Sequence, residues 1–201
     1  MRGFAAIALA LVLSGCGKAG DAGAAKGAPA SFQGVDITGA SYAHDLSLTD
    51  ADGRARSLAD FKGKIVVIFF GYTQCPDVCP ATMAELAQVK QALGAQGDRL
   101  QGVFVTIDPE RDTPAILKAY MASFDPSFVA LRGSLEQTAA AAKEFKIFYA
   151  KVPGRSEGSY SMDHTAGTFV LDAQGQPRLF ERYGAEVPAL VSDIRALLAS
   201  G

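Results

Sequence analysis

The chain has 201 residues, of which 49% are hydrophobic and 20% are charged, a balance typical of one globular domain with a short appendage. Its formal net charge is -2, and the sequence contains no zinc-finger, RNA-recognition or basic-helix motif. These features exclude nucleic acid as a partner, and we expect the protein to act as a monomer.

The first 15 residues have the pattern of a lipoprotein signal peptide. Arg2 precedes an apolar run, residues 4–13, that is too short to span a bilayer. The run leads into the sequence LSGC, in which small residues directly precede Cys16, and this resembles the lipobox of bacterial lipoproteins. An ordinary signal peptide cut nearby is the alternative, but it would leave an unpaired thiol. We therefore predict an exported protein, lipidated at Cys16 and anchored to a membrane, that faces the periplasm or the outer side of the cytoplasmic membrane.

The stretch after Cys16 predicts a tether and then a folded domain. Residues 16–31 are mostly Gly, Ala and Lys, so they cannot bury apolar surface and should be flexible. Residues 32–201 form the predicted domain. Lipidation of Cys16 leaves Cys75 and Cys79 as a pair, which in an oxidising compartment is a disulfide, a dithiol kept reduced by a partner, or a metal site.

The first half of the domain reads as alternating strands and helices. Alternating apolar residues in 42–48 predict an antiparallel hairpin or edge strand ahead of the core. Residues 65–70 (IVVIFF) are apolar on both faces, as expected of a central strand. A helix over 80–93, a strand over 102–107 and a helix over 114–124, with Ile116, Leu117, Tyr120 and Met121 on one face, complete a βαβα pattern. This pattern predicts parallel strands with right-handed crossovers.

The second half predicts a closing hairpin. A short strand over 128–131 precedes a helix over 134–145 that a capping box of Ser134 and Gln137 would begin. Strands follow over 147–152, 168–172 and 178–183, the last two joined by a tight turn, and an amphipathic helix ends the chain. The order indicates an α/β, thioredoxin-like fold, in which a central mixed β-sheet is flanked by helices and carries an N-terminal β-hairpin extension. We find no second domain.

The cysteine pair lies in the segment 71–80 (GYTQCPDVCP), between the first core strand and its helix. Ligands of open α/β sheets gather at this end of the strands. The neighbouring prolines place both cysteines in the loop, with Cys79 beside the helix N-terminus, where the helix dipole favours a thiolate. Three residues separate the cysteines, one more than in redox thioredoxins, so both sulfurs could face one ion. A disulfide also fits this spacing, although closing so short a loop would stabilise the fold little.

His164 directly precedes the predicted strand 168–172, in a loop that a thioredoxin-like fold brings near the cysteine loop. Two thiolates and one imidazole suit Cu(I), and one more ligand would complete a Cu(II) site. Zinc accepts the same donors, so the donor set alone does not identify the metal. We assign no role to His44.

Three motifs in order, 71–80, 106–114 (TIDPERDTP) and 163–165 (DHT), resemble the SCO/SenC family of copper-binding proteins, in its bacterial lipoprotein form. The similarity extends from Tyr42 to the C-terminus. The resemblance implies a thioredoxin-like fold and copper bound by Cys75, Cys79 and His164. It also implies a role in assembling the binuclear copper centre of cytochrome c oxidase, by transferring copper, by reducing the acceptor's cysteines, or by both.

Four charged residues are candidates for supporting the ligands. Asp108 and Arg111 follow a core strand and so face the same rim, where Arg111, lying between Asp108 and Asp112, could fix the loop. Asp77 and Asp163 could accept a hydrogen bond from the histidine ring or bias the approach of a partner.

These observations favour a metallochaperone over an enzyme. Its partners would be the copper-accepting subunit of a respiratory oxidase, together with other copper chaperones or thiol reductants. The rival is a thiol-disulfide oxidoreductase that acts through Cys75 and Cys79 on exported proteins. A peroxiredoxin-like enzyme would need an arginine beside the reactive thiolate, for which only Arg111 is near, and we disfavour it.

Overall fold

The structure is a computed structural model that describes residues 31–200. The predicted signal peptide (1–15), the predicted lipidation site Cys16 and the predicted tether up to residue 30 lie outside the described residues. Within residues 31–200, no helix combines the length and the apolar character needed to cross a membrane.

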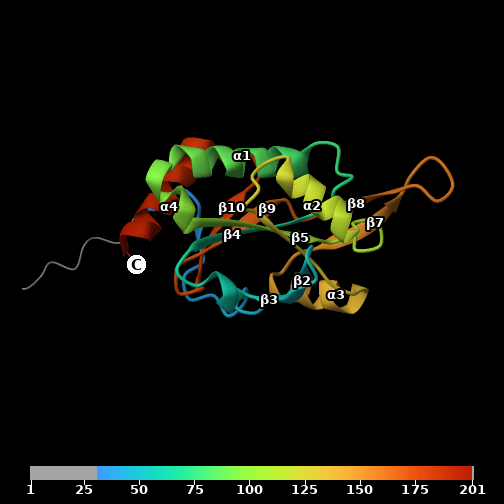
Figure 1. The fold of residues 1–201 in the computed structure, drawn as a ribbon, viewed down its shortest axis with the longest axis horizontal. Coiled ribbons are helices and arrows are strands. Elements are labelled where there is room, and N and C mark those ends of the chain that lie inside the picture. The colour runs from blue at the N-terminus through green and yellow to red at the C-terminus, as the bar shows by residue number, and fades with distance from the viewer. Residues whose placement is uncertain (1–30, 201) are drawn as a thin grey trace, which may run out of the picture. The chain divides into compact units, whose positions relative to one another are not determined.

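In residues 31–200, ten strands form two sheets. Their bounds are β1 (Val35–Asp36), β2 (Ser47–Asp50), β3 (Ala55–Ser57), β4 (Ile65–Gly71), β5 (Leu100–Thr106), β6 (Val129–Arg132), β7 (Tyr149–Pro153), β8 (Tyr160–His164), β9 (Gly167–Leu171) and β10 (Pro177–Arg182). Eight of them make one sheet in the order β1-β10-β9-β4-β5-β6-β2-β3, while β7 and β8 pair separately (Figure 1). The pairs β4–β5 and β5–β6 are parallel and the other neighbours are antiparallel, so the sheet is mixed.

Helices cover both faces of the large sheet. Their bounds are α1 (Val78–Ala92), α2 (Pro114–Ala122), α3 (Leu135–Glu144) and α4 (Val187–Ser200), with short 3₁₀ turns at Leu58–Phe61 and Gly94–Arg99. The connections β4-α1-β5 and β5-α2-β6 advance in one direction across the sheet, and because such crossovers are right-handed as a rule, α1 and α2 lie on the same face (Figure 1). Helix α4 packs beside α1, and α3 lies across the opposite face next to β2 (Figure 1).

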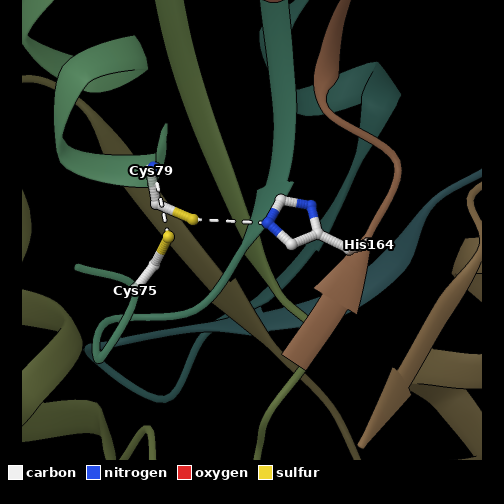
Figure 2. Close-up of side chains that lie close together, drawn as sticks. All are labelled: Cys75, Cys79 and His164. Carbon is white, nitrogen blue, oxygen red and sulfur yellow. Dashed lines mark hydrogen bonds between the residues drawn. The ribbon is translucent and has the colours of Figure 1, made fainter. Parts of the chain in front are cut away.

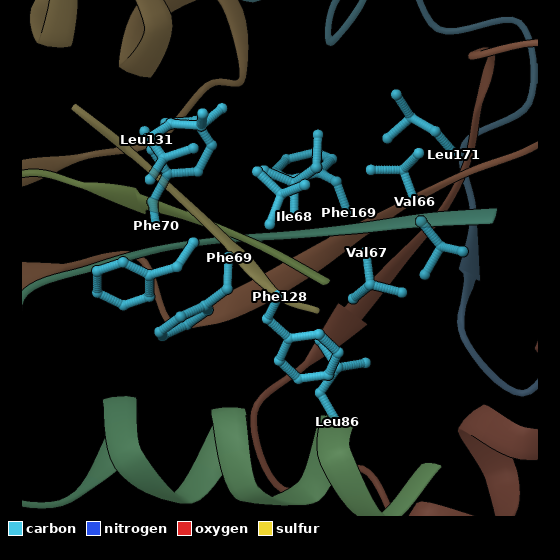
Figure 3. Close-up of a cluster of buried hydrophobic side chains, with 14 of the residues drawn as sticks. Val66, Val67, Ile68, Phe69, Phe70, Leu86, Phe128, Leu131, Phe169 and Leu171 are labelled. Carbon is cyan, nitrogen blue, oxygen red and sulfur yellow. The ribbon is translucent and has the colours of Figure 1, made fainter. Parts of the chain in front are cut away.

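Strand β4 is the centre of the core. All seven of its residues are buried, and their side chains alternate between the two faces. Val67 and Phe69 point toward α1, whereas Ile68 and Phe70 point to the opposite side (Figure 3). On that side the ring of Phe70 lies 5.2 Å from the ring of Phe145, at the end of α3. The doubly apolar sequence of this strand is thus explained by helices on both faces.

The predicted fold class is confirmed. The large sheet is mixed and flanked by helices, as in a thioredoxin-like fold. The N-terminal hairpin is β2–β3, which extends the sheet by pairing β2 with β6. The capping box at the start of α3 is also present: the Gln137 amide donates to Ser134 Oγ at 3.2 Å, and the Ser134 amide donates to Gln137 Oε1 at 2.9 Å.

Some details of the fold differ from the predictions. Ile116 was expected on the buried face of its helix but is 44% exposed, because α2 turns Leu117 and Met121 toward the sheet. Strand β8 was not predicted, since Met162 is the one buried residue among its five and gives no apolar alternation. It forms because its backbone pairs with β7.

Candidate metal centre

Cys75, Cys79 and His164 come together at one end of the large sheet (Figure 2). Their ligand atoms, two sulfurs and one ring nitrogen, all lie within 4.8 Å of one another. Cys79 Sγ is 3.5 Å from His164 Nε2. Both cysteines are free thiols. The structure therefore brings together the three residues that the sequence suggested as metal ligands.

The cysteines sit where β4 passes into α1. Helix α1 begins at Val78, so Cys79 belongs to its first turn, and the prediction that both cysteines lie in the loop is wrong for Cys79. Proline, which has no N–H, is tolerated at position 80 because the first N–H groups of a helix have no hydrogen-bond partner within the helix. The Cys79 amide instead donates to Cys75 Sγ at 3.4 Å, so the turn holds the two residues close together.

The protonation predicted for Cys79 is also corrected. Its side chain is completely buried, and burial raises the pKa of the Cys79 thiol well above its ordinary value. The favourable effect of the helix N-terminus is outweighed by the loss of solvent. Without a bound cation Cys79 is thus a neutral thiol, whereas Cys75 is half-buried and more accessible.

His164 is the last residue of β8, not part of a loop as predicted. Its Nδ1 lies 3.0 Å from the carbonyl oxygen of Thr165, which fixes the proton on Nδ1 and leaves the Nε2 lone pair facing Cys79. Burial lowers the pKa of His164, so the ring is held neutral, the form that binds metals. The rings of Tyr72 and Phe69 meet it edge-on, at 6.1 Å and 5.9 Å between centroids.

Two of the four supporting candidates, Asp77 and Asp163, form no hydrogen bond with the histidine ring. Asp77 and Asp163 are both exposed, and the ring N–H that each was expected to accept is directed instead to the Thr165 carbonyl. His44 is exposed as well, and its Nε2 lies 2.6 Å from the carbonyl oxygen of Ala40.

The loop after β5 is organised differently from the expectation. Arg111 forms an ion pair with Asp108, as expected, but not with Asp112. Asp112 is completely buried and accepts hydrogen bonds from the hydroxyls of Thr106 and Thr73, at 2.5 Å and 2.6 Å, and from the Thr73 amide. Burial raises the pKa of the Asp112 carboxyl. Asp112 therefore anchors the cysteine loop to the end of β5.

Sequence reasoning missed Gly71, the last residue of β4. An added Cβ there would lie 2.9 Å from Cys79 Sγ and 2.8 Å from Cε1 of Phe69, closer than side chains approach. Only glycine lets the sulfur sit against the strand. The signal was a glycine directly after an otherwise β-branched and aromatic run.

Chemically, the site offers two sulfurs and one imidazole nitrogen. Cu(I), a soft ion, and Zn(II), a borderline one, both bind such donors. The neutral ring with its free Nε2 and the buried Cys79 suit an ion held partly out of water, and the half-buried Cys75 and His164 leave one side of the site approachable.

Known proteins resemble this chain over most of the described residues. The sequence profile of the SCO1/SenC family matches residues 35–199. A SCO2-like protein of Rickettsia felis is 37% identical over 133 residues, which are 66% of this chain and 65% of that protein. The mitochondrial Protein SCO2 homolog of Mus musculus is 38% identical over 161 residues, 78% of this chain and 62% of that protein. The chain thus spans less than two thirds of these relatives.

A solved structure shows the same likeness. Bradyrhizobium japonicum ScoI, determined with copper bound, is 36% identical to this chain and superposes with a TM-score of 0.71. The match covers 78% of this chain and 99% of that one.

Proposed function

This chain belongs to the SCO1/SenC family, and on that premise we propose that it is a metallochaperone that binds copper through Cys75, Cys79 and His164. Its proposed role is to support assembly of the copper centre of cytochrome c oxidase. The observation that carries the proposal is the convergence of two sulfurs and a neutral imidazole within 4.8 Å. Copper in the structure of the related ScoI favours copper over zinc at these donors.

The unequal burial of the ligands suggests how the ion would leave. An acceptor thiolate would approach from the side of Cys75 and His164, since Cys79 has no exposed surface. A new metal–sulfur bond to the acceptor would form as the bond to Cys75 or His164 breaks, and Cys79 would release the ion last. The exchange changes no oxidation state and needs no catalytic base.

Thiol-disulfide exchange is the second candidate, favoured by two free thiols on a thioredoxin-like fold. The Cys75 thiolate would attack an acceptor disulfide and release one acceptor thiolate. Cys79 would then give its thiol proton to the first released acceptor thiolate, and the Cys79 thiolate would attack the Cys75 sulfur of the mixed disulfide and release the second acceptor thiolate. The acceptor thus gains two electrons, and the cysteine pair is oxidised to a disulfide. The proposed acceptor is the copper-accepting subunit, with thiol reductants restoring the pair.

We further propose that the domain is held at a membrane by a lipid on Cys16. The support is the LSGC sequence after a short apolar run, and the Gly- and Ala-rich stretch that follows it. The protein would then face the periplasm, or the outer side of the cytoplasmic membrane, as a monomer.

Metal analysis tests the copper proposal. The purified protein, with its thiols kept reduced, is incubated with Cu(I) and Zn(II) together, dialysed and analysed for both metals. Near-stoichiometric copper is expected. Zinc in its place, or no bound metal, would overturn the assignment. Reduction of a disulfide substrate by a metal-free sample, lost on Cys75→Ser, would support the second candidate.

A further inference from the structure

One side chain bridges the two segments that carry the ligands. Arg111 extends from the loop after β5, and its Nη1 donates to the carbonyl oxygen of Tyr160 at 2.7 Å and to Gln74 Oε1 at 3.3 Å. Gln74 directly precedes Cys75 in the cysteine loop. Tyr160 is the first residue of β8, the strand that ends at His164. A single guanidinium thus contacts both sides of the metal centre.

The guanidinium is itself held in place. Its Nε pairs with Asp108, a carboxylate that is only 1% exposed. Its plane lies over the ring of Tyr160, with Cζ 3.6 Å from the ring centroid. The Tyr160 hydroxyl closes the arrangement by donating to Asp108 Oδ1 at 2.8 Å. Arg111, Asp108 and Tyr160, here called the clasp, therefore form a ring of mutual contacts.

The β7–β8 hairpin depends on such contacts. It is a two-stranded sheet that does not pair with the large sheet, and isolated two-stranded hairpins are marginally stable in water. Within β8 only Met162 is buried. Lys151 of β7 also forms an ion pair with Glu110, but both side chains are 49% exposed. Such surface ion pairs contribute little to stability.

We propose that Arg111 is a positioning residue for the metal centre. The clasp holds the hairpin, and the hydrogen bond from Arg111 to Gln74 joins it to the cysteine loop, which together set the separation between His164 Nε2 and the two sulfurs. Arginine is required because one planar group must pair with a carboxylate, reach a carbonyl and stack on a ring at once, which a lysine ammonium cannot do. The expected changes in copper binding rest on the proposed function, because they require that the site binds copper.

The test uses Arg111→Lys, which keeps the charge, beside Arg111→Ala. Arg132→Lys is the matched control, because Arg132 donates to the Pro109 carbonyl in the same loop but forms no hydrogen bond with the described residues of either ligand-bearing segment. Both Arg111 variants should weaken copper binding by about 10- to 100-fold, the usual effect of losing a group that orients a ligand. They should also diminish the thiolate-to-Cu(II) absorption, while Arg132→Lys leaves both unchanged.

A double variant shows whether Arg111 acts through His164. In a His164→Ala background, Arg111→Lys should change copper affinity by less than about 2-fold, because the ligand that it positions is already gone. The proposal would be overturned if the affinity losses of the two single variants multiply in the double variant, or if the copper affinity of Arg111→Lys equals that of the wild type.

Amide hydrogen exchange of the metal-free protein separates this proposal from the proposed function. The amides of residues 160–164 should exchange faster in Arg111→Lys than in the wild type or Arg132→Lys. If the wild type binds no copper but exchange accelerates in this way, the proposed function fails and the clasp stands. If copper binds and exchange in residues 160–164 is unaltered, the clasp fails and the proposed function stands.

Discussion

Cys79 Sγ and His164 Nε2 lie 3.5 Å apart although 85 residues separate them in the chain. The register of the central strands explains this contact. Phe69 near the end of β4 pairs with Thr168 near the start of β9, so the segment before β9 lies beside the segment after β4. His164 belongs to the first of these segments and Cys79 to the second. An antiparallel pair in the middle of the sheet therefore assembles the site.

Replacing His164 by alanine should abolish the thiolate-to-Cu(II) absorption. The copper affinity should fall by more than the roughly 10- to 100-fold that follows loss of an orienting partner, because a ligand itself is removed. Disulfide reduction should persist, since it needs only the cysteines. Copper titration and a reductase assay measure the two activities. His44→Ala, at an exposed histidine outside the site, is the control, and an unaltered titration for His164→Ala would contradict the ligand assignment.

Adding a methyl group at Gly71 should disturb both the fold and the site. The new Cβ would lie 2.9 Å from Cys79 Sγ and 3.0 Å from Cε2 of Phe104, so sulfur or strand must shift. We expect Gly71→Ala to lower the free energy of unfolding by about 1–3 kcal/mol, the usual range for overpacking, and to weaken copper binding.

The control for this change is Gly175→Ala, in the turn between β9 and β10. Gly175 has a φ of 81° with open space around it, so alanine there is strained without meeting a neighbour. It should destabilise the fold while copper affinity stays the same. Denaturant unfolding and copper titration are measured for both variants, and equal copper affinity in Gly71→Ala would contradict the role of the close approach.

Removing the Asp112 carboxylate should loosen the cysteine loop. Asp112→Ala leaves the hydroxyls of the buried Thr106 and the half-buried Thr73 without their acceptor, and an unpaired buried group costs about 1–3 kcal/mol. Thermal unfolding should therefore occur at a clearly lower temperature. Glu110→Ala, in the same loop but in an exposed ion pair with Lys151, should change stability by no more than about 1 kcal/mol. Similar shifts for the two variants would contradict the anchoring role.

Stability should decrease as the pH rises toward neutrality, because of Glu181. Burial, together with the neighbouring carboxylate of Asp193, raises the pKa of Glu181 from 4.5 to about 7. Between these two pH values the folded chain keeps a proton that the unfolded chain has released. The free energy of unfolding therefore falls through this window, on the order of 3 kcal/mol in total, and levels off above it.

The variant Glu181→Gln isolates this contribution. It should remove the decrease between pH 4.5 and about 7 and be more stable than the wild type at pH 8. Denaturant unfolding at several pH values gives the difference between the two proteins. If the free energy of unfolding changes with pH in the same way for the wild type and the variant, the proton is not held by Glu181.

Local sequence patterns predicted most of the helices and strands. A strand that is apolar on both faces, as in residues 65–70, predicts helices on both sides, and the capping pair Ser134 and Gln137 marks where a helix begins. The cysteine spacing within 71–80 and its position after a core strand located the site. These signals depend on neighbours in the chain, and the sequence displays them directly.

The tertiary structure decided what depends on distant segments. The neutral state of the Cys79 thiol follows from burial by the surrounding elements, which overrides the helix terminus that the sequence suggested. Strand β8 forms because it pairs with β7. Arg111 forms hydrogen bonds with Tyr160 and Gln74, which lie 49 and 37 residues away in the chain. His164 became a candidate through family resemblance, and the fold placed its free nitrogen toward the sulfurs. Sequence alone thus identified the donors, while packing between remote segments set their distances and protonation.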